Sequence, residues 1–135
     1  MGTKDKILAT ALQLLNEHGV KAVTIRDVAA EMGISHGNLG YHYANMDKII
    51  FALYQALVEK MDATIAAIQV PEIHFRLIVT GAQQTFLLFY EYRFLFIDFV
   101  TIGRSIPKLK KHYIALQQQR EIAFFEVIQL LQQKD

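Results

Sequence analysis

Residues 24–43, TIRDVAAEMGISHGNLGYHY, have the pattern of two short helices joined by a tight glycine turn. Thr24 begins a capping-box arrangement at the start of the first helix. Gly33 comes directly after the last apolar residue of that helix. Glycine readily adopts the left-handed conformation with which many helices end. Ser35 then serves as the N-cap of the second helix. The stretch therefore predicts a helix-turn-helix unit.

The second helix of this unit is unusual because it contains two glycines, Gly37 and Gly40. Each glycine costs roughly 1 kcal/mol relative to alanine in a helix interior, so packing through Leu39 must hold the segment in place. Glycine also lets a backbone come close to another molecule, and polar side chains surround it here. These features indicate a helix that lies in a DNA groove. The alternative is a structural helical hairpin whose glycines only permit tight packing.

The string GISHGNLGYHYANMDKII, residues 33–50, resembles the TetR family of bacterial transcriptional regulators. That family has a glycine turn, a recognition helix that ends in an aromatic-His-aromatic triplet, and then a capped fourth helix. The resemblance covers residues 3 to about 55 well. From residue 71 to residue 135 it extends only to helical character and order.

The resemblance implies DNA contacts at individual positions. The start of the recognition helix would read base edges, because an asparagine amide can bond adenine bidentately and a glycine backbone can approach a thymine methyl group. The end of that helix, and the starts of the second and fourth helices, would contact phosphates or bases. The candidate DNA-binding residues are Thr24, Arg26, Ser35, His36, Gly37, Asn38, Tyr41, His42 and Lys48.

Two features argue against strong electrostatic attraction to DNA. The family usually has lysine at the positions of Ala44 and Met46, and it often has an aromatic residue in place of Gly40. Residues 1–48 carry no net charge, so we expect a modest dependence of DNA affinity on salt. Their five cations, Lys4, Lys6, Lys21, Arg26 and Lys48, balance five anions, Asp5, Glu17, Asp27, Glu31 and Asp47.

The rest of the sequence predicts helices and no convincing strand. The predicted fold is all-α, with a three-helix helix-turn-helix head in residues 1–48 and a helical-bundle regulatory and dimerisation domain in residues 49–135. The apolar pattern over residues 72–92 runs nearly all round the predicted helix, which is typical of a buried helix. Further helices are predicted over residues 3–18 (capped by Thr3), from Asn45 to about Ile68, over 94–102 and over 108–133, with breaks at 69–71 and 103–107.

Aromatic side chains are concentrated between residues 75 and 125. The family resemblance implies that this part of the chain encloses a small apolar ligand, and ligand pockets are mostly apolar with a few polar anchors. The alternative is a hydrophobic core together with an interface for further helices. The candidate pocket residues are Phe86, Phe89, Tyr90, Phe96 and Phe99, with Gln83 and Asp98 as polar anchors.

Composition limits the other functional classes. The 135-residue chain has no cysteine, no uncharged apolar run of the ~20 residues that span a bilayer, and no signal-peptide layout, so a cytoplasmic protein is expected. No nucleophile motif or metal-ligand spacing is present, so we expect neither an enzyme nor a cofactor or metal site. The last helix has no stop signal, and the family carries two further helices, so we expect a longer polypeptide.

The sequence therefore predicts a ligand-responsive repressor that binds a palindromic double-stranded DNA operator as a homodimer. Its effector would be a small apolar molecule, and it would have no membrane partner. The alternative is a helical small-molecule-binding or protein-interaction protein that does not bind DNA. The neutral head and the two missing lysines favour that alternative.

Overall fold

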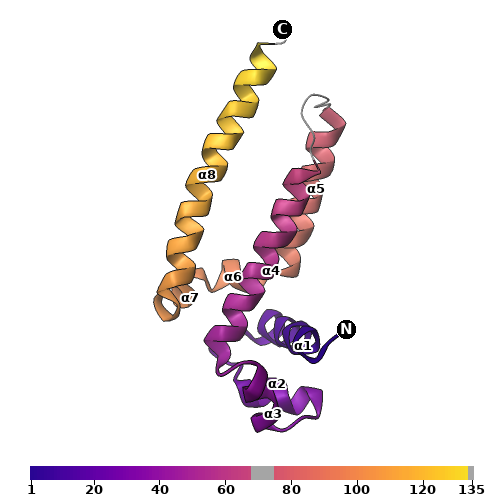
Figure 1. Cartoon of the computed structure of the whole chain (residues 1–135), viewed down its shortest axis with the longest axis vertical. Helices are drawn as coiled ribbons and strands as arrows, with labels where there is room; N and C mark the ends of the chain where they lie inside the picture. Colours follow the sequence, from indigo (N-terminus) through magenta and orange to yellow (C-terminus); the bar gives the residue numbers. More distant parts are fainter. Residues whose placement is uncertain (68–74, 134–135) are drawn as a thin grey trace.

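The computed structural model describes residues 1–67 and 75–133, which form an elongated molecule (Figure 1). Eight helices and no strand occur within these residues. The all-α prediction is confirmed. The helices are α1 (Thr3–His18), α2 (Ile25–Met32), α3 (His36–His42), α4 (Met46–Ala66), α5 (Phe75–Glu91), α6 (Arg93–Ile97), α7 (Phe99–Ser105) and α8 (Pro107–Gln132).

The head consists of α1, α2 and α3, and its hydrophobic core continues into the first turns of α4. In Figure 1 the head occupies one end of the molecule, and the C-terminus of the chain lies at the other. Because α4 supplies part of the head core and then runs away from it, this helix connects the head to the rest of the chain. The buried residues here include Ile7, Ala11, Leu15, Val28, Ala29, Leu39, Ile49, Ile50 and Leu53.

Local capping signals explain where the helices of the head begin and end. The Thr24 side chain accepts a hydrogen bond from the Asp27 N–H (3.3 Å), and the Asp27 carboxylate accepts one from the Thr24 N–H (2.7 Å), which completes the predicted capping box. Gly33 has φ of 66° in the left-handed region, as predicted. Ser35 and Asn45 cap α3 and α4 as predicted. The prediction for α1 was wrong, because its N-cap is Gly2 rather than Thr3.

Beyond the head, α4 and α5 lie side by side, the short helices α6 and α7 cross near the head, and α8 runs back along the molecule (Figure 1). Phe94 and Leu95 from α6, Ile102 from α7 and Leu109 from α8 are buried where these elements meet. No helix in the described ranges has the length and apolarity that a membrane crossing requires.

The structure corrects two predictions for the second half of the chain. The region predicted as one helix over 94–102 followed by a break at 103–107 is two helices, and the chain turns at Ile106. Gly103 lies inside α7 rather than at a turn, and an added Cβ would make an ordinary van der Waals contact with the Lys110 side chain (3.4 Å). The predicted break at 69–71 and the predicted start at residue 72 lie outside the described residues.

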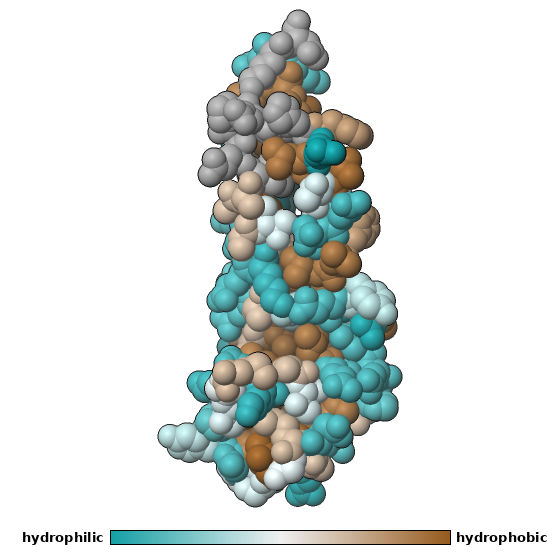
Figure 2. All heavy atoms as spheres, turned by 90° about the vertical axis from the view of Figure 1, so that its right-hand side faces the viewer, coloured by the Kyte–Doolittle hydropathy of each residue, from teal (hydrophilic) through white to brown (hydrophobic). Residues whose placement is uncertain are grey.

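The second correction concerns α5, which was predicted to be buried. None of its residues is buried, and Phe75 and Phe86 are 82% and 71% exposed. Figure 2 shows hydrophobic side chains at the surface on the side of the molecule that α4 and α5 occupy. An apolar helix becomes buried only if another element covers it, and no described element covers the outer face of α5.

Candidate nucleic-acid interface and effector cavity

Helix α3 lies at the opposite end of the molecule from the last turns of α8 (Figure 1). Leu39 is fully buried and anchors the helix in the head core. His36 and Asn38 are exposed, and the Tyr41 side chain is 87% exposed. The Tyr41 ring meets the half-buried His42 edge-on, with ring centroids 5.3 Å apart. The fold therefore brings these candidate DNA contacts together on one surface.

The two glycines of α3 are not required by packing within the chain. A Cβ added at Gly37 or Gly40 would meet no atom within 4 Å. This open space contradicts the alternative in which the glycines only permit tight packing of a helical hairpin. The low helix propensity of glycine is therefore not offset by any internal contact at these two positions.

The remaining candidate DNA contacts differ in whether the side chain still has a hydrogen-bond donor to offer to DNA. The Thr24 hydroxyl donates to Asp27 Oδ2 (2.6 Å), so its proton is already used. Hydrogen bonds from the Thr24 side chain and backbone to its carboxylate lower the pKa of Asp27. By contrast, Ser35 Oγ only accepts a hydrogen bond, from the Asn38 N–H (3.1 Å), and keeps its own proton to donate. Arg26 and Lys48 are exposed at the starts of α2 and α4.

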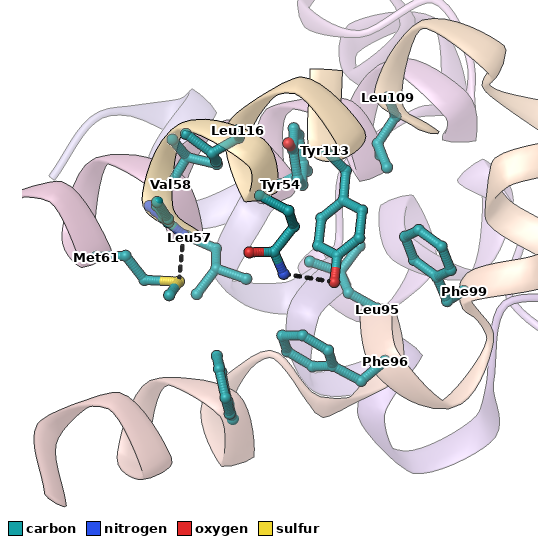
Figure 3. Close-up of a pocket in the computed structure, with 13 residues that line it drawn as sticks. Tyr54, Leu57, Val58, Met61, Leu95, Phe96, Phe99, Leu109, Tyr113 and Leu116 are labelled. Atoms are coloured by element: carbon teal, nitrogen blue, oxygen red, sulfur yellow. Dashed lines mark hydrogen bonds between the residues drawn. The ribbon is translucent and has the colours of Figure 1, made fainter. Parts of the chain in front are cut away.

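A largely apolar cavity of about 340 Å³ lies between α4, α8 and the α5–α7 segment (Figure 3). Of the predicted pocket residues, Phe89, Phe96 and Phe99 line it. The cavity residues of α4 and α8 were not among those predicted. Helix α4 contributes Tyr54, Leu57, Val58 and Met61, α8 contributes Leu109, Tyr113, Leu116, Gln117 and Arg120, and Leu95 of α6 completes the lining.

The other predicted pocket residues do not line this cavity. Phe86 and Tyr90 are 71% and 69% exposed, and Gln83 is exposed on the same helix. Asp98 has a structural role instead, because its Oδ2 accepts a hydrogen bond from the Val20 N–H of the head (3.0 Å). For the three residues on α5, the reason is the orientation of the helix, whose apolar surface extends well beyond the side that faces α4.

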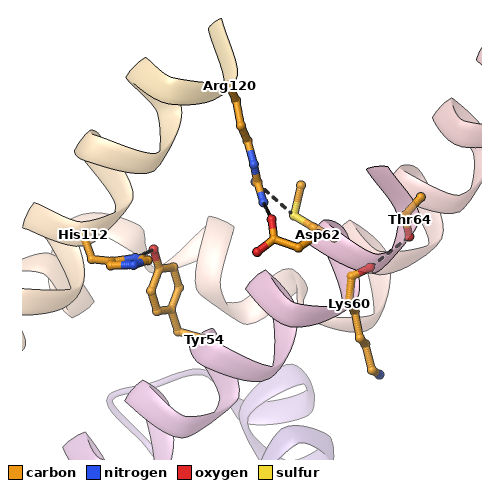
Figure 4. Close-up of polar contacts among 7 residues, drawn as sticks. Tyr54, Lys60, Asp62, Thr64, His112 and Arg120 are labelled. Atoms are coloured by element: carbon orange, nitrogen blue, oxygen red, sulfur yellow. Dashed lines mark hydrogen bonds and ion pairs between the residues drawn. The ribbon is translucent and has the colours of Figure 1, made fainter. Parts of the chain in front are cut away.

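Polar contacts at the cavity connect α8 to α4 (Figure 4). The Tyr54 hydroxyl and His112 Nδ1 are hydrogen-bonded at 2.7 Å, and burial raises the pKa of Tyr54. Arg120 Nη2 bonds Asp62 Oδ1 at 3.0 Å, and Arg120 Nη1 contacts the Met61 sulfur at 3.6 Å. These contacts fix the positions of the two helices that form opposite walls of the cavity.

The segment that forms the cavity floor also contacts the head. The Asn16 side chain of α1 donates to the Glu91 carbonyl (2.7 Å) and accepts from the Phe94 N–H (3.1 Å). Asp98, which bonds Val20, lies in the sequence between the cavity residues Phe96 and Phe99. These bonds connect the cavity segment directly to α1 and to the residues that follow it.

We expect Asn16→Ala to lower the free energy of unfolding by about 1–3 kcal/mol, because it removes two hydrogen bonds and leaves the Phe94 N–H and Glu91 carbonyl without these partners. Urea denaturation followed by circular dichroism measures the change. Gln13→Ala on the same helix is the control, since Gln13 makes only an exposed bond to Glu17, and its effect should stay within about 0.5 kcal/mol. Equal losses for the two variants would contradict a structural link through Asn16.

Comparison with known proteins agrees with this architecture. Residues 7–53 match the family model described as "Bacterial regulatory proteins, tetR family", and residues 56–135 match the model described as "Bacterial transcriptional repressor". The chain belongs to the TetR family. The sequence-based resemblance is thus confirmed. The two matches meet within α4, so this helix is shared between the head and the regulatory part, and the predicted division after residue 48 stays a prediction.

Individual relatives of this TetR-family chain are distant. It is 28% identical over 91 residues to the HTH-type transcriptional regulator CymR of Pseudomonas putida. This alignment covers 64% of this chain and 45% of CymR. It is 31% identical over 55 residues to the tetracycline repressor protein class C of Escherichia coli, covering 41% and 25% of the two chains. The chain therefore spans less than half the length of the curated relatives it matches.

Solved structures share the fold of this TetR-family chain. The crystal structure of a TetR-family transcriptional regulator from Marinobacter aquaeolei VT8 superposes with a TM-score of 0.84 at 29% identity, over 88% of this chain and 59% of that one. The fatty acid degradation regulator FadR from Bacillus halodurans has a TM-score of 0.59 at 20% identity, over 86% of this chain and 65% of that one, which shows the fold alone.

Proposed function

We propose that this protein is a ligand-responsive transcriptional repressor that binds a palindromic operator as a homodimer and releases it when an effector occupies the cavity. One observation carries the proposal: α3 is anchored by Leu39 on one side and presents exposed polar groups beside two glycines with open space on the other. That arrangement suits a helix that enters the major groove of DNA. Such a protein would act in the cytoplasm and would catalyse no reaction.

Base reading in this proposal falls to His36 and Asn38, with the Gly37 backbone close to the DNA. An asparagine amide can donate to and accept from the edge of adenine at the same time. Ser35, Arg26 and Lys48 would bind phosphates and fix the register of α3. Tyr41 and His42 would contact phosphates or bases at the other end of the helix. Thr24 would contribute by capping α2 rather than by donating to a phosphate.

The exposed apolar surface supports self-association. Phe86, Leu87 and Tyr90 on α5 and Phe124 and Phe125 on α8 are more than half exposed. Monomeric proteins rarely expose large contiguous apolar patches, and those that do often use them to bind another protein. In a homodimer, two copies of α3 would contact half-sites about one helical turn of DNA apart or slightly more.

The contacts between the cavity segment and the head support an effect of the ligand on DNA binding. A ligand against Phe96 and Phe99 would act on the segment that holds Asp98, and Asp98 bonds the head at Val20. An effector shifts the balance between DNA-binding and released forms only by its difference in affinity for the two.

Gly37→Ala separates the proposed function from a merely structural role of α3. We expect the variant to gain stability, by about 0.5–1 kcal/mol, because alanine has the higher helix propensity and its Cβ meets no atom. We also expect weaker DNA binding, because the added methyl group would lie between the helix and the groove. Urea denaturation and fluorescence anisotropy with the DNA upstream of the protein's own gene measure the two effects. A stabilised variant that binds DNA as tightly as the wild type would contradict the proposal.

A further inference from the structure

The charge at the cavity lining is positive and is supplied by one residue. Among the thirteen residues that line the cavity in the described part of the chain, Arg120 is the one that carries a charge, and no carboxylate side chain is included. Asp62 pairs with Arg120 from outside the lining, and its side chain is 59% exposed. A cationic ligand would therefore meet a like charge inside the cavity, and an anionic ligand would meet an opposite one.

The guanidinium of Arg120 has hydrogen-bonding capacity left over. Nη2 is bound to Asp62 at 3.0 Å. Among the described residues, Nη1 contacts only the Met61 sulfur at 3.6 Å, and thioether sulfur is a weak acceptor. The buried Nε has no hydrogen-bond partner within residues 1–67 and 75–133. Buried polar groups in native structures normally have one. A ligand oxygen at Nη1 would replace this weak sulfur contact with a hydrogen bond between charged groups, since the terminal N–H groups of a guanidinium match a carboxylate.

A second donor is available on the same wall of the cavity. Gln117 Nε2 donates to the Tyr113 hydroxyl oxygen at 2.7 Å, so the hydroxyl proton of Tyr113 remains free (Figure 3). The Tyr54 hydroxyl differs, because it is already bonded to His112. Tyr113 and Arg120 lie seven residues apart on α8, which places them two turns apart on the same face of the helix.

The apolar part of the cavity is suited to a flat ring system. Phe89 and Phe96 have ring centroids 4.7 Å apart, and Phe99 and Tyr113 have ring centroids 4.8 Å apart. Aromatic rings pack well against one another in offset or edge-on arrangements. The volume of about 340 Å³ exceeds the ~150 Å³ of a cavity that takes up benzene, so it accommodates one or two fused rings with a polar group.

From these observations we infer that the effector is a small aromatic monocarboxylate. Its carboxylate binds Arg120 and Tyr113, and its ring system lies among Phe89, Phe96 and Phe99. This inference deepens the proposed function, in which the cavity takes up the effector. A dianion is disfavoured because the lining offers a single cation, which Asp62 already shares.

The test compares 2-naphthoate, neutral 2-naphthamide and cationic 2-naphthylmethylammonium in binding to the protein by isothermal titration calorimetry, without DNA. We expect 2-naphthoate to bind at least about tenfold more tightly than the amide, because hydrogen bonds between charged groups are the stronger ones. We expect no measurable binding of the ammonium compound. Equal affinities for the carboxylate and the amide, or no binding of any of the three at millimolar concentration, would overturn the inference.

Two variants locate the carboxylate. Arg120→Met should weaken 2-naphthoate binding at least about tenfold while changing 2-naphthamide binding less than about threefold, because only the charged interaction is lost. Lys111→Met is the matched control, since it removes one positive charge from an exposed position of α8, and it should leave both affinities unchanged. Tyr113→Phe keeps the ring and should weaken 2-naphthoate specifically, which tests the site if Arg120→Met does not fold. Unchanged 2-naphthoate binding in a folded Arg120→Met or Tyr113→Phe protein would refute this assignment.

DNA binding measured in parallel by fluorescence anisotropy separates this inference from the proposed function. Sequence-selective DNA binding without preference for the carboxylate would refute the ligand class and leave the repressor proposal standing. Arg120-dependent binding of 2-naphthoate without sequence-selective DNA binding would support the ligand class and contradict the repressor proposal.

Discussion

Leu39→Ala should lower the free energy of unfolding by about 2–5 kcal/mol, the range for truncating a fully buried leucine. Leu39 is the buried residue of α3, and its side chain is 0% exposed. The helix has seven residues and contains two glycines, so little intrinsic helix propensity remains once that anchor is removed. Because domains are stable by only about 5–15 kcal/mol, this loss is large enough to detach α3 or to unfold the head.

Urea denaturation followed by circular dichroism measures this effect. Leu14→Ala in α1 is the matched control, because the same atoms are removed from a half-buried position. Its cost should be clearly smaller. Comparable losses for the two variants, or a folded Leu39→Ala protein with unchanged DNA affinity, would show that Leu39 does not hold α3 in place.

The fold of the head could be predicted from sequence because its signals are local. Thr24, Gly33, Ser35 and Asn45 each act on backbone groups within a few residues of themselves, and each occupies the predicted cap. Leu39, the residue predicted to hold α3 in place by packing, is fully buried. The exception was α1, where Gly2 and Asp5 provide the capping contact that was predicted for Thr3.

The regulatory part was harder to predict because its features depend on how distant segments meet. The apolar residues all round α5 indicate that other elements should pack against the helix. The pattern does not indicate whether the described residues supply those elements, and in the structure no residue of α5 is buried. Asp98 was predicted as a polar anchor of the ligand pocket, whereas the fold brings it against Val20, 78 residues away in sequence. Arg120 was not predicted as a cavity residue, because it reaches the cavity and Asp62 only once α8 lies opposite α4.

Asn38→Ala should remove a base preference rather than weaken DNA binding uniformly. A good bidentate contact to a base is worth about 1–3 kcal/mol of discrimination, which corresponds to roughly 5- to 150-fold between the right and the wrong base. The Asn38 side chain is exposed, and the cap of α3 uses its backbone N–H rather than its amide, so truncation should leave the fold intact. Lys48→Ala is the contrasting variant, because loss of a phosphate contact should weaken binding to all sequences alike and reduce the salt dependence.

Selection of bound sequences from a random double-stranded DNA library, with the wild-type protein and Asn38→Ala side by side, tests most directly whether α3 reads DNA bases. We predict that the wild type selects a palindromic consensus with half-sites about one helical turn apart or slightly more. Asn38→Ala should select the same consensus except for one lost base preference in each half-site. No consensus for the wild type, or an identical consensus for the two proteins, would contradict the reading of bases by Asn38.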